Sequence, residues 1–131
     1  MTGRAVAVAF RSCETRRRER RERHQRRLLV TKPARVAKWL AFAHVIDERI
    51  RSDELRDHAD AARALGFTRT RISQIMSLLL LAPDIQEEIL SLRHPAGREP
   101  LSERDLRSVA RHPLWDDQRR EWGRVRGKLS A

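Results

Sequence analysis

The 131-residue chain has a single cysteine, Cys13, no tyrosine and three tryptophans. One thiol cannot form a disulfide or a thiolate metal cluster within the chain, so a reducing compartment is the simplest setting. Because so few aromatic rings are available to stack on unpaired bases, the composition also disfavours a single-strand nucleic-acid binder.

Long apolar runs are lacking as well. No stretch approaches the roughly 20 apolar residues of a membrane span, since Ile75–Ala82 is interrupted by Ser77 and ends at Pro83. The apolar stretch Ala5–Phe10 is too short for a convincing signal-peptide core. We therefore expect no membrane partner and a cytoplasmic protein.

Recognisable catalytic and metal-binding patterns are also missing. The five histidines are scattered, without metal-ligand spacing, and no glycine-rich phosphate loop is present. The histidines are His24, His44, His58, His94 and His112. The sequence thus predicts no enzyme, no metal, no cofactor and no small-molecule substrate.

Positive charge is abundant: 29 Lys and Arg against 18 Asp and Glu give a net charge of +11. Such a balance favours a polyanionic partner, of which nucleic acid and an acidic membrane surface are the two common kinds. Residues 1–30 hold ten Arg and three Glu (10 − 3 = +7), so most of the excess lies there. We expect accessory phosphate contacts from Arg16, Arg17, Arg18, Arg20 and Arg21.

The basic segment 14–27 places an acid four residues before a base three times, which supports a solvated helix. It has no apolar face, so the helix is marginal alone and orders best against a phosphate backbone. We interpret residues 1–30 as a flexible, disordered basic arm. A solubilising tail or a misassigned start codon is the alternative.

The remainder predicts an all-α fold: a small helical domain over 31–125 and a basic C-terminal tail over 126–131. Apolar residues at steps of three and four predict a helix from Lys32-Pro33 to Arg51, with Trp39 and His44 in packing roles. Further helices are expected from Pro83, with Ile85, Ile89 and Leu90 inward, over 102–111, and over 114–122. Residues 93–100 are expected to form a loop, and no strand is expected apart from a weak possibility at Ala5–Phe10.

Residues 58–77 fit a helix-turn-helix. Asp57 is a plausible N-cap for a helix over 58–65, Gly66 suits the turn, and Thr68 can cap a second helix reaching about Leu80. Ala62 provides the small residue where the helices cross. Ile72 and Ile75 can anchor the second helix on the first.

The outward residues of this second helix are polar or basic, and no acid lies between Asp60 and Asp84. In a DNA-binding helix-turn-helix the second helix enters the major groove, where arginine pairs with guanine and glutamine with adenine. The expected DNA-binding residues are Thr68, Arg69, Thr70, Arg71, Ser73, Gln74 and Ser77.

The stretch ADAARALGFTRTRISQIMSLLLLAPDIQEEILS resembles the helix-turn-helix domain of ParB and KorB-type partition and repressor proteins. The similarity extends more weakly through PLSERDLRSVAR and covers about residues 54–111. The resemblance implies DNA binding at Arg69, Thr70, Ser73 and Gln74. The chain lacks the nucleotide-binding region that precedes this domain in partition proteins, so nucleotide-driven sliding and chromosome partition are not carried over.

The sequence thus predicts a bacterial, nucleoid-associated protein that binds double-stranded DNA sequence-specifically, either a transcriptional regulator or an accessory factor of a mobile element. A homodimer and a site-specific recombinase are the expected protein partners, with Trp115 and Trp122 as candidates for the interface or the core. The alternative is a helical adaptor, or an RNA-binding module that uses the arginine-rich arm.

Overall fold

The computed structural model describes residues 12–29, 31–95 and 97–130, and within them the protein is almost entirely helical, as the sequence predicts. The α-helices are α2 (Cys13–Leu29), α3 (Arg35–Arg51), α4 (His58–Leu65), α5 (Arg69–Met76), α6 (Pro83–Leu90), α7 (Glu103–Ala110) and α8 (Trp115–Val125). Two 3₁₀ helices, η1 (Ser77–Leu80) and η2 (Arg126–Ser130), follow α5 and α8. Strands β1 (Thr31–Pro33) and β2 (Arg93–Pro95) pair in a two-stranded sheet.

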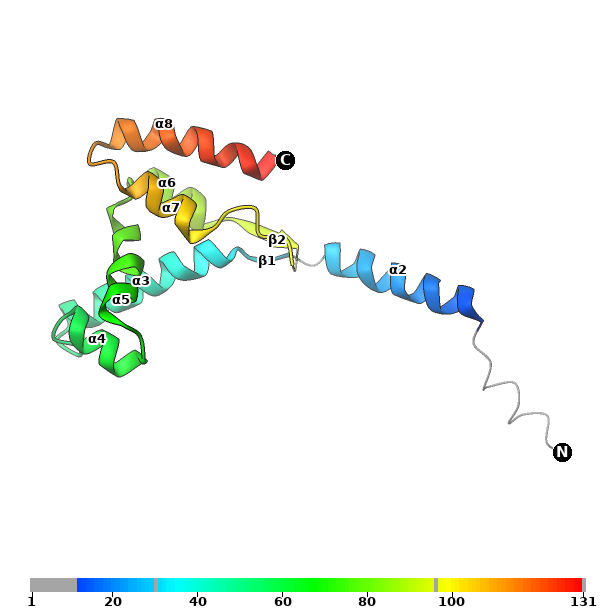
Figure 1. The fold of residues 1–131 in the computed structure, drawn as a ribbon, viewed down its shortest axis with the longest axis horizontal. Helices are drawn as coiled ribbons and strands as arrows, with labels where there is room; N and C mark the ends of the chain where they lie inside the picture. Colours follow the sequence, from blue (N-terminus) through cyan, green and yellow to red (C-terminus); the bar gives the residue numbers. More distant parts are fainter. Residues whose placement is uncertain (1–11, 30, 96, 131) are drawn as a thin grey trace. The chain divides into compact units, whose positions relative to one another are not determined.

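The chain divides into two compact units. The smaller one contains α2, and the larger one, here called the helical domain, comprises residues 33–94 and 98–130. In the helical domain, α4 and α5 pack at one end of α3, while α6 and α7 pack along the rest of it and α8 covers α7 (Figure 1).

The helical domain has two apolar cores that share α3. The first joins the N-terminal half of α3, including Leu40, to η1, α6, α7 and α8, and the second joins Ala43 and Ile46 to α4 and α5. Trp39 and Leu79 pack against both cores. The two ends of the domain are therefore held in one packed body.

Local signals explain where the helices begin. Asp57 accepts a hydrogen bond from the backbone N–H of Asp60 at 2.8 Å and caps α4, as predicted. Pro83 occupies the first turn of α6. Helix α3 has no side-chain cap of its own, and the carboxylate of Glu99 instead accepts the backbone N–H of Arg35 at 3.1 and 3.2 Å.

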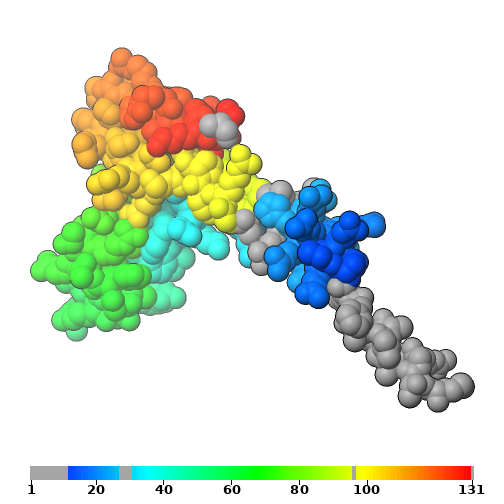
Figure 2. Space-filling model, turned by 45° about the vertical axis from the view of Figure 1, so that its right-hand side comes forward, coloured from blue at the N-terminus to red at the C-terminus, as the bar shows by residue number. Residues whose placement is uncertain are grey.

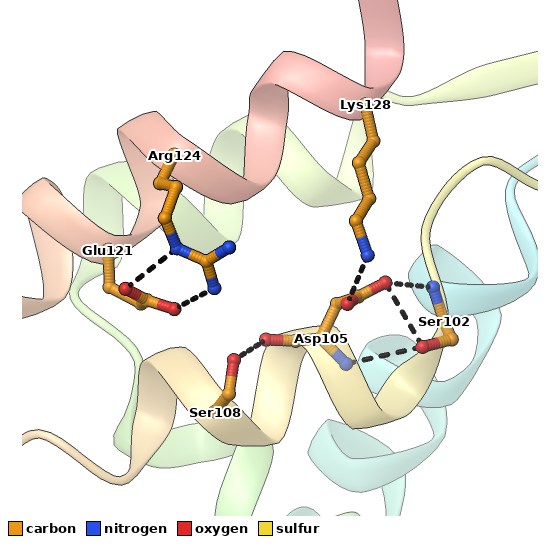
Figure 3. A network of polar contacts seen from close by, with 6 residues as sticks. All are labelled: Ser102, Asp105, Ser108, Glu121, Arg124 and Lys128. Atoms are coloured by element: carbon orange, nitrogen blue, oxygen red, sulfur yellow. Dashed lines mark hydrogen bonds and ion pairs between the residues drawn. The ribbon is translucent and has the colours of Figure 1, made fainter.

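Helix α7, predicted over 102–111, begins with a capping box. The hydroxyl of Ser102 accepts the N–H of Asp105 at 3.3 Å, and the Asp105 carboxylate accepts the N–H of Ser102 at 2.9 Å. The ammonium of Lys128 in η2 donates to the same carboxylate at 2.8 Å (Figure 3). Burial raises the pKa of Asp105, but the hydrogen bonds from Lys128 and Ser102 outweigh it, and the pKa lies below its usual value.

Several boundary predictions are wrong. The loop expected over 93–100 contains β2, and β1 is a second strand that the pattern does not reveal, while Ala5–Phe10 lies outside the described residues. Helix α8, expected to end at residue 122, runs to Val125. In the segment expected to be a tail, Arg126–Ser130 form η2, and Leu129 packs on the first core.

Some predicted packing roles are also wrong. Leu90, expected to face inward, is 44% exposed. His44 is exposed rather than packed, and its Nε2 donates to the amide oxygen of Gln86 at 2.7 Å. Of the two tryptophans left open, Trp122 is in the first core and Trp115 is 51% exposed.

Candidate nucleic-acid interface

Helix α4, the turn and α5 form the helix-turn-helix predicted from the sequence. Gly66 ends α4 in the left-handed conformation, with φ of 74°, and the N–H of Phe67 returns to the carbonyl of Ala62 at 3.0 Å. Apart from Gly66 and its neighbours in the chain, no residue has a heavy atom within 4 Å of the place where a Cβ would stand on Gly66. The turn therefore needs glycine for its backbone conformation and not for space.

The second core fixes the orientation of α5. Ala61 and Ala62 are buried in α4, and Ile72 and Ile75 are both 0% exposed on the facing side of α5. Phe67 makes edge-to-face contacts with Trp39 and Phe42, with ring centroids 6.5 and 6.2 Å away. The predicted anchoring role of the two isoleucines is thus confirmed.

The exposed side of α5 carries polar and basic residues at its N-terminal end. Arg69, Thr70 and Ser73 are exposed, as is Thr68, whose hydroxyl caps α5 by accepting the N–H of Arg71 at 3.1 Å. Thr68 thus has a structural role in addition to any contact with a ligand.

The first turn of α5 contains no acid. Helices α4, α6, α7 and α8 each have an acid there, whereas α3 and α5 have none and begin with Arg35 and Arg69. At α3 the carboxylate of Glu99 accepts the N–H of Arg35. A helix N-terminus carries partial positive charge from its unpaired N–H groups, which carboxylates ordinarily complement. The start of α5 combines this partial charge with an arginine and hydroxyls, a set that suits a negatively charged ligand.

Arg71 does not point outward, so this part of the sequence prediction is wrong. Its guanidinium lies 4.5 Å from the ring centroid of Trp39, and its Nη1 is 2.6 Å from a carboxylate oxygen of Glu103. The side chains of Arg71 and Glu103 are only 27% and 12% exposed. Arg71 therefore braces α5 against α3 and the start of α7.

The far end of the predicted reading helix also differs from expectation. The α-helix ends at Met76 instead of about Leu80, and η1 continues the chain. Ser77 is half-buried, and its hydroxyl donates to the carbonyl of Gln74 at 2.6 Å. Gln74 is itself half-buried and accepts a long hydrogen bond of 3.4 Å from Arg71. The best-presented residues are accordingly Arg69, Thr70 and Ser73, together with the cap Thr68.

The predicted phosphate-contact residues lie in α2, in the smaller unit. All five are exposed: Arg16, Arg17, Arg18, Arg20 and Arg21. The solvated helix predicted over 14–27 is present as part of α2. The guanidinium of Arg18 pairs with Glu22 across one turn at 3.1 Å. Residues 1–11 of the arm lie outside the described residues.

The sequence prediction missed Gln118, a buried residue of α8 that holds the segment following η1. Its amide oxygen accepts the N–H of Ala82 at 2.8 Å, and its amide nitrogen donates to the carbonyls of Leu80 and His112 at 3.0 and 2.9 Å. It thereby satisfies three backbone groups where η1, α6 and α8 meet. In the string DDQRRE nothing distinguishes this glutamine from a solvated one.

We find no match to the chain among known protein families, curated proteins or solved structures. The resemblance to ParB and KorB-type domains therefore rests on the sequence pattern itself. Within the described residues no group of three or more histidine, cysteine or acidic side chains is arranged to hold a metal ion. Among those residues, too, no helix has the length and apolar character needed to cross a membrane.

Proposed function

We propose that the protein binds double-stranded DNA sequence-specifically and that α5 lies in the major groove. The observation that carries the proposal is the N-terminal half of α5, where Arg69, Thr70 and Ser73 are exposed on a helix whose other side is anchored by Ile72 and Ile75. A rigidly held helix that presents donors at its N-terminal end is the element that reads base edges in helix-turn-helix proteins.

Charge around α5 supports the same proposal. From residue 61 to residue 83 the chain has three arginines and no acid, although it has 18 acids in all. Figure 2 shows the surface of α4 and α5, in green, at the opposite end of the helical domain from the orange and red surface of α8. DNA at α5 therefore leaves the surface of α8 open to a protein partner.

A homodimer is part of this proposal, because one helix-turn-helix buries little surface and gains affinity by binding two half-sites. Leu114 and Trp115, next to one another at the start of α8, are 64% and 51% exposed. We place the dimer contact there. Sedimentation of the full chain and of Trp115→Ser tests it, and the substitution is expected to shift the protein to monomer.

Selection of bound sequences from a pool of random duplexes tests the DNA-binding proposal. We expect one enriched motif for the unsubstituted protein, and a relaxed preference at one base position for Arg69→Ala, with a loss of about 1–3 kcal/mol of discrimination. Ser108→Ala, on α7, is the control and should retain the motif. Equal binding to all duplexes would contradict sequence-specific recognition.

The RNA-binding alternative is tested by titrating the protein with structured RNA and with the selected duplex. If the protein binds duplex DNA sequence-specifically, the biological role we propose is that of a transcriptional regulator or an accessory factor of site-specific recombination. Copurification with a recombinase would separate the second role from the first.

A further inference from the structure

Helix α2 has one face with a charge pattern of its own. Arg16, Arg17, Arg20 and Arg21 lie at positions i, i+1, i+4 and i+5, which places them side by side over one and a half turns. All four are exposed. The acids Glu14, Glu19 and Glu22 fall outside this four-residue cluster, which we call the arginine face.

Arg18 belongs to the other side of α2. It stands four residues from both Glu14 and Glu22, and its guanidinium pairs with Glu22 at 3.1 Å. Arg26 likewise stands four residues after Glu22. On that side the positive charge is largely compensated within the helix.

Within the arginine face, Arg16 and Arg17 each have an acid three residues away, Glu19 and Glu14, whereas Arg20 and Arg21 have none one turn away. The residues three and four positions away from Arg20 and Arg21, in either direction, are all basic or uncharged. Arg16 with Arg20 and Arg17 with Arg21 form like-charge pairs one turn apart, which destabilise a helix in water. A helix that sorts its charges in this way is stabilised by a dense, regular array of negative charge.

We infer that the arginine face of α2 binds the phosphate backbone of duplex DNA, and that Arg18 takes no part. Arginines four residues apart on α2 are about 6 Å apart along the helix axis, and duplex DNA offers phosphates at a closely spaced, regular interval along each strand. This inference rests on the proposed function for the choice of DNA as the polyanion. It assigns to α2 an affinity role that is independent of base sequence.

The test compares two charge-matched double variants of the full chain. Arg17→Gln/Arg21→Gln removes two charges from the arginine face, and Arg18→Gln/Arg26→Gln removes two from the opposite side. Binding to a fixed duplex is titrated over a range of salt concentrations, and far-ultraviolet circular dichroism monitors helix content. Because the first variant relieves like-charge repulsion, we expect its helix content to be retained.

We expect Arg17→Gln/Arg21→Gln to reduce the slope of log affinity against log salt by about 1.8, since each phosphate contact contributes about 0.9. The opposite-side variant should leave the slope nearly unchanged. Equal reductions in both variants would overturn the inference, because net charge alone would then explain them. A reduction seen only with an RNA duplex of the same sequence would also overturn it.

Arg69→Ala separates this inference from the proposed function. If Arg69→Ala relaxes base preference while the two double variants behave alike, α5 reads DNA and the arginine face does not contact it. If the arginine-face variant alone lowers the slope and no variant changes base preference, α2 binds DNA but the sequence-specific reading by α5 is wrong. Absence of binding to any duplex would overturn both.

Discussion

The exposed side of α5 and the arginine face of α2 are both basic surfaces, but different physics holds their side chains in place. Arg69, Thr70 and Ser73 have fixed positions because Ile72 and Ile75, on the other side of α5, are completely buried. The arginine face depends only on the local helix of α2, which buries no side chain among its described residues. Base recognition needs the first kind of surface, whereas phosphate attraction needs only charge at a suitable density.

The largest expected effect comes from removing the support of α5. Ile72→Ala leaves a cavity in the second core and should lower the free energy of unfolding by about 2–5 kcal/mol. Urea unfolding measures this change, with Ser73→Ala on the exposed side as the control, expected within about 0.5 kcal/mol of the original. A small effect of Ile72→Ala would mean that packing does not fix α5.

Arg71→Ala tests whether this residue stabilises the packing of α5 or contacts DNA bases. Because it removes the contact with Trp39 and leaves the Glu103 carboxylate only its longer ion pair with Arg107, at 3.7 Å, it should destabilise the domain by about 1–3 kcal/mol. Arg71→Lys keeps the positive charge but loses the planar contact with Trp39, so its stability should lie between those of the original and Arg71→Ala. If Arg71→Ala instead lost base preference at unchanged stability, Arg71 would be a residue that contacts DNA bases.

Substitution of two glycines by alanine separates the effect of backbone conformation on stability from the effect of the room available for a Cβ. Gly66→Ala should cost about 1–2 kcal/mol, because the residue has φ of 74°. Gly123→Ala, in the middle of α8 with an equally open Cβ position, should raise stability by about 0.5–1 kcal/mol. Thermal unfolding of both variants measures the contrast, and changes of the same sign would refute it.

The smallest expected effect is a pH dependence at the start of α7. The pKa of Asp105 is lower in the folded protein than in the unfolded chain, so its ionised form stabilises the fold. This contribution is complete above the unfolded value, about 3.9, and is lost as the pH falls from there through the lower folded pKa. The stability difference between the original and Asp105→Asn should therefore shrink as the pH is lowered below about 4, as unfolding at several pH values would show.

Much of the helical framework was predictable from local chemistry. Helix ends are marked by interactions within a few residues, and the structure has all of those marked by Asp57, Gly66, Thr68, Pro83 and the capping box at Ser102. The strands β1 and β2 were not predictable, because each has three residues and pairs with a partner about 60 positions away. Length and periodicity give no signal at that size.

The sequence by itself determined the helical class, the turn at Gly66 and the apolar side of α5, because these follow from backbone preferences and from the spacing of apolar residues. Only the tertiary structure decided which polar residues of α5 stay exposed. Arg71 looks like a reading residue in sequence, but Glu103, 32 positions later, and Trp39, 32 positions earlier, hold its guanidinium. Gln118 likewise owes its role to backbone groups brought together by folding, since burial and long-range partners are not encoded in any local pattern.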